Sequence, residues 1–456
     1  MELLLNPAPG KERAVSFWKN PSAWIQEKNL SRGYWIFFSA AFFFDAGFSV
    51  YVFLFNLFLL DNHFNERAMG WIGGAMTLGS VIGTLPAGAL ARRIGLRPLL
   101  IVLFITAPIL SATRALWIWQ PAQITLAFLT GIAMSSWGVC FLPAIARLTT
   151  EKNRTSAFSL IFSASIGTGI LGGIVCGYLR SWLESLGIVT QPVEVKRLIL
   201  LASCALVLVG LIPVFRLRMP AEQEEDSVQE QDPDPNPDRD NVPQSLPPAP
   251  SSRLHDWLRK QSLSPFLIRF LPAMALWCAI LAAFTPFANV YLSRNLHIPI
   301  EQIGLIFSTV QIVQFAMGIA TPFLFRVLGL VRGIVSTQIA AAVVLALLAG
   351  AHNGKLAIAL YLIFSAAQWM SAPGLYNLLM NETPDRERST AAAMTLFCNA
   401  LAGSAATAVA GVLFTRFGYP PVLLGIAIAA VATSLFFLLL ISPLLHRQSQ
   451  SKPETT

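Results

Sequence analysis

Hydrophobic residues along this chain are gathered into twelve long runs, separated by short segments that are polar or basic. A helix needs about 20 mostly apolar residues to cross the ~30 Å hydrocarbon core of a bilayer, and most of these runs reach that length. The pattern predicts an all-α membrane protein with twelve transmembrane helices, in preference to a large soluble protein with buried helices. The predicted spans are 33–60, 70–90, 98–117, 122–146, 155–179, 197–215, 270–292, 303–325, 333–351, 356–380, 389–414 and 420–442.

Similar residues recur at a fixed offset of 234 positions, always at corresponding places relative to the apolar runs. The pairs are Gly70 and Gly304, Gly95 and Gly329, Arg154 and Arg388, and Gly177 and Gly411. The chain therefore reads as two pseudo-symmetric six-helix bundles, residues 33–215 and 270–442. A duplicated set of six spans is typical of secondary transporters, whose two halves rock about a central site.

The segments outside the bundles have a different composition. Residues 1–32 and 443–456 flank the spans, and residues 216–269 link the two halves. Within that linker, 219–252 is rich in proline and carries nine of the 24 acidic residues, so it cannot bury enough apolar surface to fold. We interpret it as a disordered tether, with a regulatory role left open.

Basic residues are distributed unevenly between the two sides of the membrane. If the N-terminus is placed in the cytoplasm, the outer loops and span ends hold only eight of the 32 Lys and Arg residues, leaving 24 on the inner side. The eight are Arg67, Arg114, Arg180, Lys196, Arg197, Arg294, Lys355 and Arg416. This bias predicts that both termini are cytoplasmic, and it explains the net charge of +8 without nucleic-acid binding. Arg114 and Arg294 are expected to snorkel from outer span ends.

The loop after the second span has the sequence GALARRIGLRPL, from Gly88 to Leu99. It resembles the loop signature of the major facilitator superfamily, in which a glycine turn holds basic residues at the cytoplasmic surface. Gly88, Arg93, Gly95 and Arg97 match the signature, whereas Arg92 stands where the family usually has Asp. The resemblance covers the chain except its termini and the linker, and it implies twelve helices, alternating access and a latch between the halves on the inner side.

Three more loops belong with this predicted cytoplasmic gate. The equivalent loop of the second half, LFRVLGLVRG from Leu324, keeps Arg326 and Gly329. Acid and arginine pairs stand three residues apart before spans five and eleven, and such pairs can bond to each other or cap a helix. They are Glu151 with Arg154, and Asp385 with Arg388. The resemblance implies a gating role for these charges, while the alternative is ordinary positive-inside topology.

Asp45 lies near the middle of the first span, where a charge costs ~2.5–3.5 kcal/mol on insertion scales. Helical spacing places Ser49 and Asn56 on the same face, which gives a polar stripe. An acid in such surroundings can bind and release a proton, so Asp45 is the predicted residue for proton coupling, substrate binding or both. The alternative is a structural hydrogen bond to a neighbouring helix. Its counterpart in the repeat is Ala279, so the duplicated fold does not itself require an acid there.

Other polar side chains within the spans are candidates for lining a central cavity. They are Thr77, Ser80, Thr285, Asn289, Gln311, Gln314, Gln368, Trp369 and Asn399. Each could equally join neighbouring helices. A site with one acid and many amide, hydroxyl and aromatic groups suits a neutral, amphipathic or cationic solute better than a polyanion.

The sequence thus predicts a multi-pass transporter of the inner or plasma membrane that moves a small organic solute by alternating access. Proton coupling and export of lipophilic or cationic compounds are favoured. The alternatives are a uniporter or importer of a sugar-like or other nutrient and, more remotely, a membrane receptor or membrane enzyme. We expect no enzymatic activity, no metal and no cofactor, because the histidines are scattered and the cysteines have no ligand spacing. The expected partners are the lipid bilayer, the solute and protons, with the chain acting as a monomer.

Overall fold

A computed structural model describes residues 30–185, 191–219, 264–383 and 388–441. Within these residues it contains twelve helices long and apolar enough to cross a membrane, and no strand. The first-half helices are α3 (Arg32–Asp61), α4 (Glu66–Ile94), α5 (Leu96–Leu116), α6 (Gln120–Leu148), α7 (Glu151–Ser185), α8 (Pro192–Val209) and the short α9 (Leu211–Arg216). Those of the second half are α11 (Pro265–Phe284), α13 (Ile300–Leu328), α14 (Leu330–Ala349), α15 (Gly354–Glu382), α16 (Arg388–Phe417) and α17 (Tyr419–Leu440).

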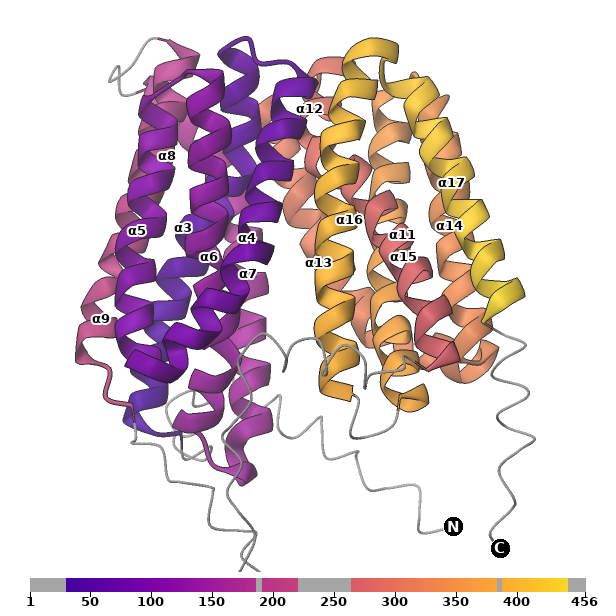
Figure 1. Ribbon diagram of the computed structural model, residues 1–456. Coiled ribbons are helices and arrows are strands. Elements are labelled where there is room, and N and C mark those ends of the chain that lie inside the picture. The colour runs from indigo at the N-terminus through magenta and orange to yellow at the C-terminus, as the bar shows by residue number, and fades with distance from the viewer. Residues whose placement is uncertain (1–29, 186–190, 220–263, 384–387, 442–456) are drawn as a thin grey trace, which may run out of the picture.

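The two halves stand side by side, the first drawn in indigo to magenta and the second in orange to yellow (Figure 1). The N-terminal end of α3 and the C-terminal end of α17 both face the lower end of the view (Figure 1). This arrangement confirms the predicted twelve-helix all-α fold. Residues 220–263 of the predicted linker and the predicted tail from 443 onward lie outside the described residues.

Glycine makes the sharpest turns between consecutive spans. Gly95 joins α4 to α5 and Gly329 joins α13 to α14, with φ of +87° and +79°. Such positive values are strained for residues that carry a β-carbon, so a glycine is needed to reverse the chain within one residue. The two turns lie 234 positions apart, which makes the repeat visible in the backbone as well as in the sequence.

The seventh span differs from its prediction as a regular helix over 270–292. α11 ends at Phe284 and is followed by a 3₁₀ turn at Thr285–Phe287, a single turn α12 (Ala288–Val290) and a π-helical turn at Tyr291–Asn295. The cause is Pro286, which has no N–H to donate and frees nearby backbone carbonyls. The carbonyl of Ala282, four residues earlier, accepts instead from Thr407 Oγ1 at 3.0 Å. The carbonyl of Pro286 itself, within the irregular turns, accepts a hydrogen bond from the other half, as described below.

Aromatic packing holds the first half together around the middle of α3. Phe44 stacks on Trp137 of α6, with ring centroids 4.2 Å apart, and also packs on Phe104 of α5 at 5.3 Å. Phe44 directly precedes Asp45 in sequence, and its packing on these two rings fixes the rotation of α3. The neighbouring acid is thereby directed away from them, toward α7.

Candidate functional site

Two seams of small residues join the halves at one end of the molecule, which we call the sealed end. In one seam α4 packs on α16, where a β-carbon added to Gly70 would lie 3.0 Å from Cα of Gly411. In the other α13 packs on α7, where a β-carbon on Gly304 would lie 3.2 Å from Cα of Gly177. Glycine allows this close approach of two backbones. The repeated glycines of the sequence therefore meet across the halves, as two copies of the same contact.

Hydrogen bonds to backbone carbonyls reinforce the sealed end. Asn56 Nδ2 donates to the carbonyl of Pro286 at 2.8 Å, and Asn289 Nδ2 donates to that of Phe53 at 3.0 Å. Each amide crosses from one half to the other, beside the irregular turns that follow α11. Two serine hydroxyls within the seams also donate across the halves, Ser308 to the carbonyl of Ile170 and Ser404 to the carbonyl of Gly74.

An ion pair that the sequence analysis missed also closes this end. Glu66 is 3% exposed, and both its carboxylate oxygens accept from Arg294 Nη1, at 3.0 and 2.9 Å. The hydroxyl of Tyr419 donates to the same carboxylate at 3.4 Å. Arg294, which the sequence analysis expected only to snorkel, thus also pairs with an acid of the opposite half, while its own side chain stays 55% exposed. No sequence pattern marked the pair, since each residue lies beside a predicted span.

The opposite end of the molecule, which holds the turns at Gly95 and Gly329, is called the open end. Toward it, α4 and α13 bury fewer side chains. Beyond Val310, the only buried residue described for α13 is Thr321. In α4 beyond Gly74, the buried Gly79 and Gly83 pack on α6 of their own half. The contact between halves is thus concentrated at the sealed end, and the two bundles part toward the open end.

Asp45 lies just beyond the seal on the open side. Ser165 of α7 donates a hydrogen bond from Oγ to Asp45 Oδ2, and both side chains are half-buried. One turn along α7 stands Gly169, where the amide of Gln311 from the other half occupies the space that a side chain would fill. Since residues four apart share a helix face at about 5–6 Å, the acid and the amide lie one turn from each other. The site therefore contains groups from both halves.

Two predicted cavity residues are engaged elsewhere. Ser49 Oγ donates to carbonyls of its own helix and of Thr168, so it joins α3 to α7. Thr77 Oγ1 donates back to the carbonyl of Gly73 in its own helix, as in ordinary helix packing. Asn56 and Asn289 belong to the seal already described.

The remaining cavity candidates are at least partly accessible. Thr285 Oγ1 donates to Gln368 Oε1 at 3.4 Å, which joins the end of α11 to α15. Trp369 is 49% exposed and lies against Gly318 of α13. Ser80 and Gln314 are half-buried.

Asn399 holds the repeat position of Ser165. It is half-buried, and its Oδ1 is inaccessible to solvent and has no hydrogen-bond partner in the structure. Ser165, which donates a hydrogen bond to Asp45 in the first half, thus corresponds in the second half to Asn399, whose amide oxygen accepts no hydrogen bond from the described residues.

Two arginines of the predicted cytoplasmic gate donate hydrogen bonds to backbone carbonyls of their own half. Arg97 donates to the carbonyl of Phe215 at 2.7 Å. Arg388 donates from Nε to the carbonyls of Met380 and Thr383. The remaining members differ in exposure: Arg92, Arg93 and Arg326 are exposed, whereas Gly88 and Arg154 are half-buried. Asp385 lies outside the described residues, as does the side chain of Glu151.

Arg114 is a second departure from the sequence analysis. It is 3% exposed, lies over the ring of Phe55 at 4.2 Å, and donates from Nε to Gln123 Oε1 at 3.5 Å. Gln123 also donates to the carbonyls of Arg114 and Trp117 at 2.6 and 2.8 Å. The predicted snorkelling is therefore wrong, because the cation stacks on an aromatic ring inside the first half.

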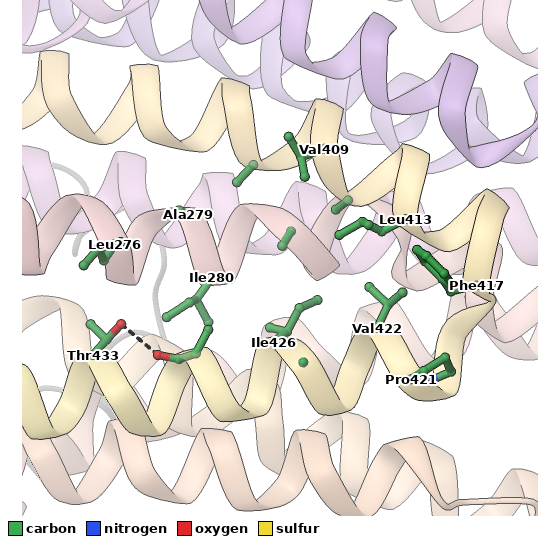
Figure 2. Close-up of a pocket in the computed structure, with 15 residues that line it drawn as sticks. Leu276, Ala279, Ile280, Val409, Leu413, Phe417, Pro421, Val422, Ile426 and Thr433 are labelled. Carbon is green, nitrogen blue, oxygen red and sulfur yellow. Dashed lines mark hydrogen bonds between the residues drawn. The ribbon is translucent and has the colours of Figure 1, made fainter.

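An apolar groove of about 600 Å³ lies within the second half, between α11, α16 and α17 (Figure 2). Ala279, the repeat counterpart of Asp45, is part of its wall. The hydroxyl of Thr433 is satisfied by the carbonyl of Ala429 at 2.9 Å. With no charged residue among those that line it, the groove suits hydrocarbon and has none of the chemistry of the Asp45 site. Among the described residues, no three His, Cys, Asp or Glu side chains are placed to hold a metal.

Two pseudo-symmetric six-helix bundles, joined at one end and separate at the other around a membrane-embedded acid, define a secondary transporter. The sequence matches the Major Facilitator Superfamily over residues 37–407, and the chain belongs to that family. It is accordingly a multi-pass membrane transporter, as its sequence predicted.

Solved structures agree with this fold. The nucleoside transporter NupG superposes with a TM-score of 0.69 at 14% identity, covering 90% of this chain and 99% of that one. A D-xylose-proton symporter gives 0.66 at 15% identity, covering 90% and 97%. The inward-open xylose transporter XylE from E. coli gives 0.64 at 15% identity, covering 89% and 95%. At these identities the likeness concerns the fold alone. No curated protein matches the sequence.

Proposed function

We propose that this protein carries a small organic solute across the cell membrane by alternating access, coupled to protons through Asp45. One observation carries the proposal: Asp45 lies at the inner limit of the seal, bonded to Ser165, one helical turn from Gln311 of the opposite half. A group at that place changes its surroundings whenever the halves move. Its protonation and the conformation are therefore linked, as coupling requires.

The conformation described here corresponds, in this proposal, to the inward-facing state. The positive-inside rule assigns the arginine-rich end to the cytoplasm, and that end is the open one. Both termini are then cytoplasmic. Since one chain supplies both halves of the site, we propose that the monomer is the transporting unit.

The chemistry around Asp45 supports a neutral or cationic solute. Gln311, Gln368 and Thr285 offer amide and hydroxyl groups, while Trp369 offers an exposed aromatic face. Such groups bind polar atoms and apolar or cationic surfaces without the inward-facing arginines or lysines that a phosphate ester would need. Export of a lipophilic cation is favoured within this range.

The test is transport by purified protein in proteoliposomes. A thermal-stabilisation screen with nucleosides, pentoses and lipophilic cations such as tetraphenylphosphonium identifies a solute, whose flux is then measured with and without a pH gradient. Asp45→Asn should abolish gradient-driven flux and leave membrane insertion and solute exchange intact. Asp61→Asn is the comparison variant: it removes a carboxylate that pairs with Lys196 at the sealed end of the same helix, so a loss of flux seen in both variants would not be specific to Asp45.

Full gradient-driven flux in Asp45→Asn would refute proton coupling through this residue. Flux that ignores the pH gradient in the unmodified protein would instead indicate a uniporter, the nutrient-carrying alternative. Binding without any flux in either direction would contradict transport altogether.

A further inference from the structure

Four arginines converge on one cleft at the open end of the first half. Arg32 begins α3, Arg97 lies in the first turn of α5, Arg216 ends α9 and Arg218 follows it. The cleft has a volume of about 700 Å³, and its other lining residues are Gly33, Ile36 and Phe215. None of the described residues that line it is acidic.

This convergence is not explained by membrane topology alone. The positive-inside rule accounts for arginines at one membrane face, but it does not require four guanidinium groups from separate segments to share one cleft. Like charges held close together repel, so the arrangement costs free energy unless an anion occupies it. Arg97 is only partly satisfied: one Nη donates to the carbonyl of Phe215, while its solvent-inaccessible Nε has no hydrogen-bond partner among the described residues.

The surroundings of the cleft combine charge with apolar surface. Phe215 is 52% exposed and Ile212, on the same short helix, is 54% exposed. Both lie near the last turn of a candidate spanning helix, Val193–Arg216, and the ends of such helices are where the headgroups of a bilayer meet the acyl chains. A soluble anion needs only the arginines, whereas a lipid would use the arginines and the apolar rim together.

Guanidinium groups point to phosphate as the anionic group. Their planar forks bind phosphate oxygens in pairs, more specifically than lysine can. The adjoining N-terminus of α5 has no side-chain cap, so its free N–H groups add a partial positive charge to the same place. Basic pockets between transmembrane helices on the cytoplasmic side bind the headgroups of anionic lipids in this way.

We propose that this arginine cleft binds the phosphate headgroup of an anionic phospholipid from the surrounding leaflet. The site lies within one half and is separate from the Asp45 site. The proposal therefore does not depend on which solute is carried or on proton coupling.

The experiment uses the purified full-length chain in a non-ionic detergent, with bound lipids counted by native mass spectrometry. The probes are dihexanoyl-phosphatidylglycerol, dihexanoyl-phosphatidylcholine and inorganic phosphate. We expect one phosphatidylglycerol to bind in preference to phosphatidylcholine, and to bind less tightly as salt is raised. The combined substitutions Arg32→Gln, Arg216→Gln and Arg218→Gln should weaken that binding at least ~10-fold.

A matched control removes the same charge from the same end, outside the cleft, by Arg93→Gln, Arg326→Gln and Arg332→Gln. This variant should bind phosphatidylglycerol like the unmodified chain. An equal loss in both variants would mean non-specific surface charge and would overturn the proposal. Inorganic phosphate that competes fully with the lipid at equal concentration would assign the cleft to a soluble anion instead.

A third variant guards against loss of folding. Replacing Arg32, Arg216 and Arg218 by lysine keeps the charge and removes the planar forks. Intermediate affinity is expected from it, because a lysine ammonium attracts phosphate only as a point charge. Unchanged affinity in both the lysine and the glutamine variants would exclude the cleft as the binding site.

Discussion

Substitution of Gly70 by alanine should shift the protein away from the sealed conformation. A β-carbon at this position would lie 2.8 Å from the carbonyl oxygen of Thr407, 3.0 Å from Cα of Gly411 and 3.2 Å from the carbonyl oxygen of Ala408. All three atoms belong to the backbone of α16, in the opposite half. No side-chain rotation can relieve the overlap, so α4 and α16 must separate.

The size of the effect follows from that overlap. Inserting a methyl group into a close-packed contact costs typically ~1–3 kcal/mol. The cost applies only while the seam is closed, so it changes the ratio of sealed to unsealed states by roughly 5–150-fold. The gain of about 0.5–1 kcal/mol from replacing glycine in a helix is the same in both states and cancels. Gly70→Val should act in the same direction and more strongly.

Distances between spin labels on opposite halves measure this shift. One pair, at Arg67 and Arg416, reports on the sealed end, and a second pair, at Arg93 and Arg326, reports on the open end. The labels require a background in which the five native cysteines are replaced. In Gly70→Ala the first distance should lengthen and the second should shorten, because the halves pivot about the site between them.

Gly167→Ala provides the matched control, since nothing lies within 4 Å of the β-carbon it would add. It should leave both distance distributions unchanged. If Gly70→Ala and Gly70→Val also leave them unchanged, the seam does not set the balance between conformations and the reasoning is refuted. An equal shift in the control would be just as damaging, because the effect would then come from helix propensity.

Two further substitutions test polar contacts seen only in the folded structure. Arg294→Gln should lengthen the same sealed-end distance, because it removes a charge-assisted bond worth ~1.5–3 kcal/mol from the buried Glu66. In a double-mutant cycle with Glu66→Gln, the effects of the two substitutions should be coupled, and independent effects would contradict the ion pair. Gln123→Ala should lower the unfolding free energy by about 2 kcal/mol, because two backbone carbonyls each lose a hydrogen bond worth ~1 kcal/mol. The exposed Gln120→Ala should leave the unfolding free energy unchanged. Equal melting temperatures for these two glutamine variants would refute the second expectation.

The spans and the repeat could be predicted from sequence because both are properties of one segment at a time. Hydropathy fixes the length of a helix, and the recurrence of Gly70 as Gly304 needs only an alignment of the two halves. The contacts of Gly70 with Gly411 and of Gly304 with Gly177 could not be predicted. A sequence pattern describes the faces of one helix, whereas these contacts depend on how two helices pack. Pro286 did indicate the break in the helix after Phe284, but it lies within an apolar run that was interpreted as one continuous span.

The charged contacts were harder to predict for a physical reason. Glu66 and Arg294 each stand at the edge of an apolar run, where a charge normally reaches water or headgroups. Arg114 occupies the same kind of position, and its contact with Phe55 depends on how α3 packs on α5. Position along a span therefore does not tell a solvated charge from a buried one.

The proposed site depends on a position that differs between the halves, and this asymmetry can be tested directly. Asp45 corresponds to Ala279, yet the two face different surroundings. Asp45 meets Ser165 close to Gln311 of the other half, whereas Ala279 faces an apolar groove inside its own half. An acid moved to that groove would have neither the Ser165 hydroxyl nor a group of the other half nearby, and it would cost ~2.5–3.5 kcal/mol to insert. Ala279→Asp should therefore fail to restore gradient-driven transport to Asp45→Asn. Restoration would mean that either half can supply the acid. The position of Asp45 beside Ser165 and close to Gln311 would then not be what couples protons to transport.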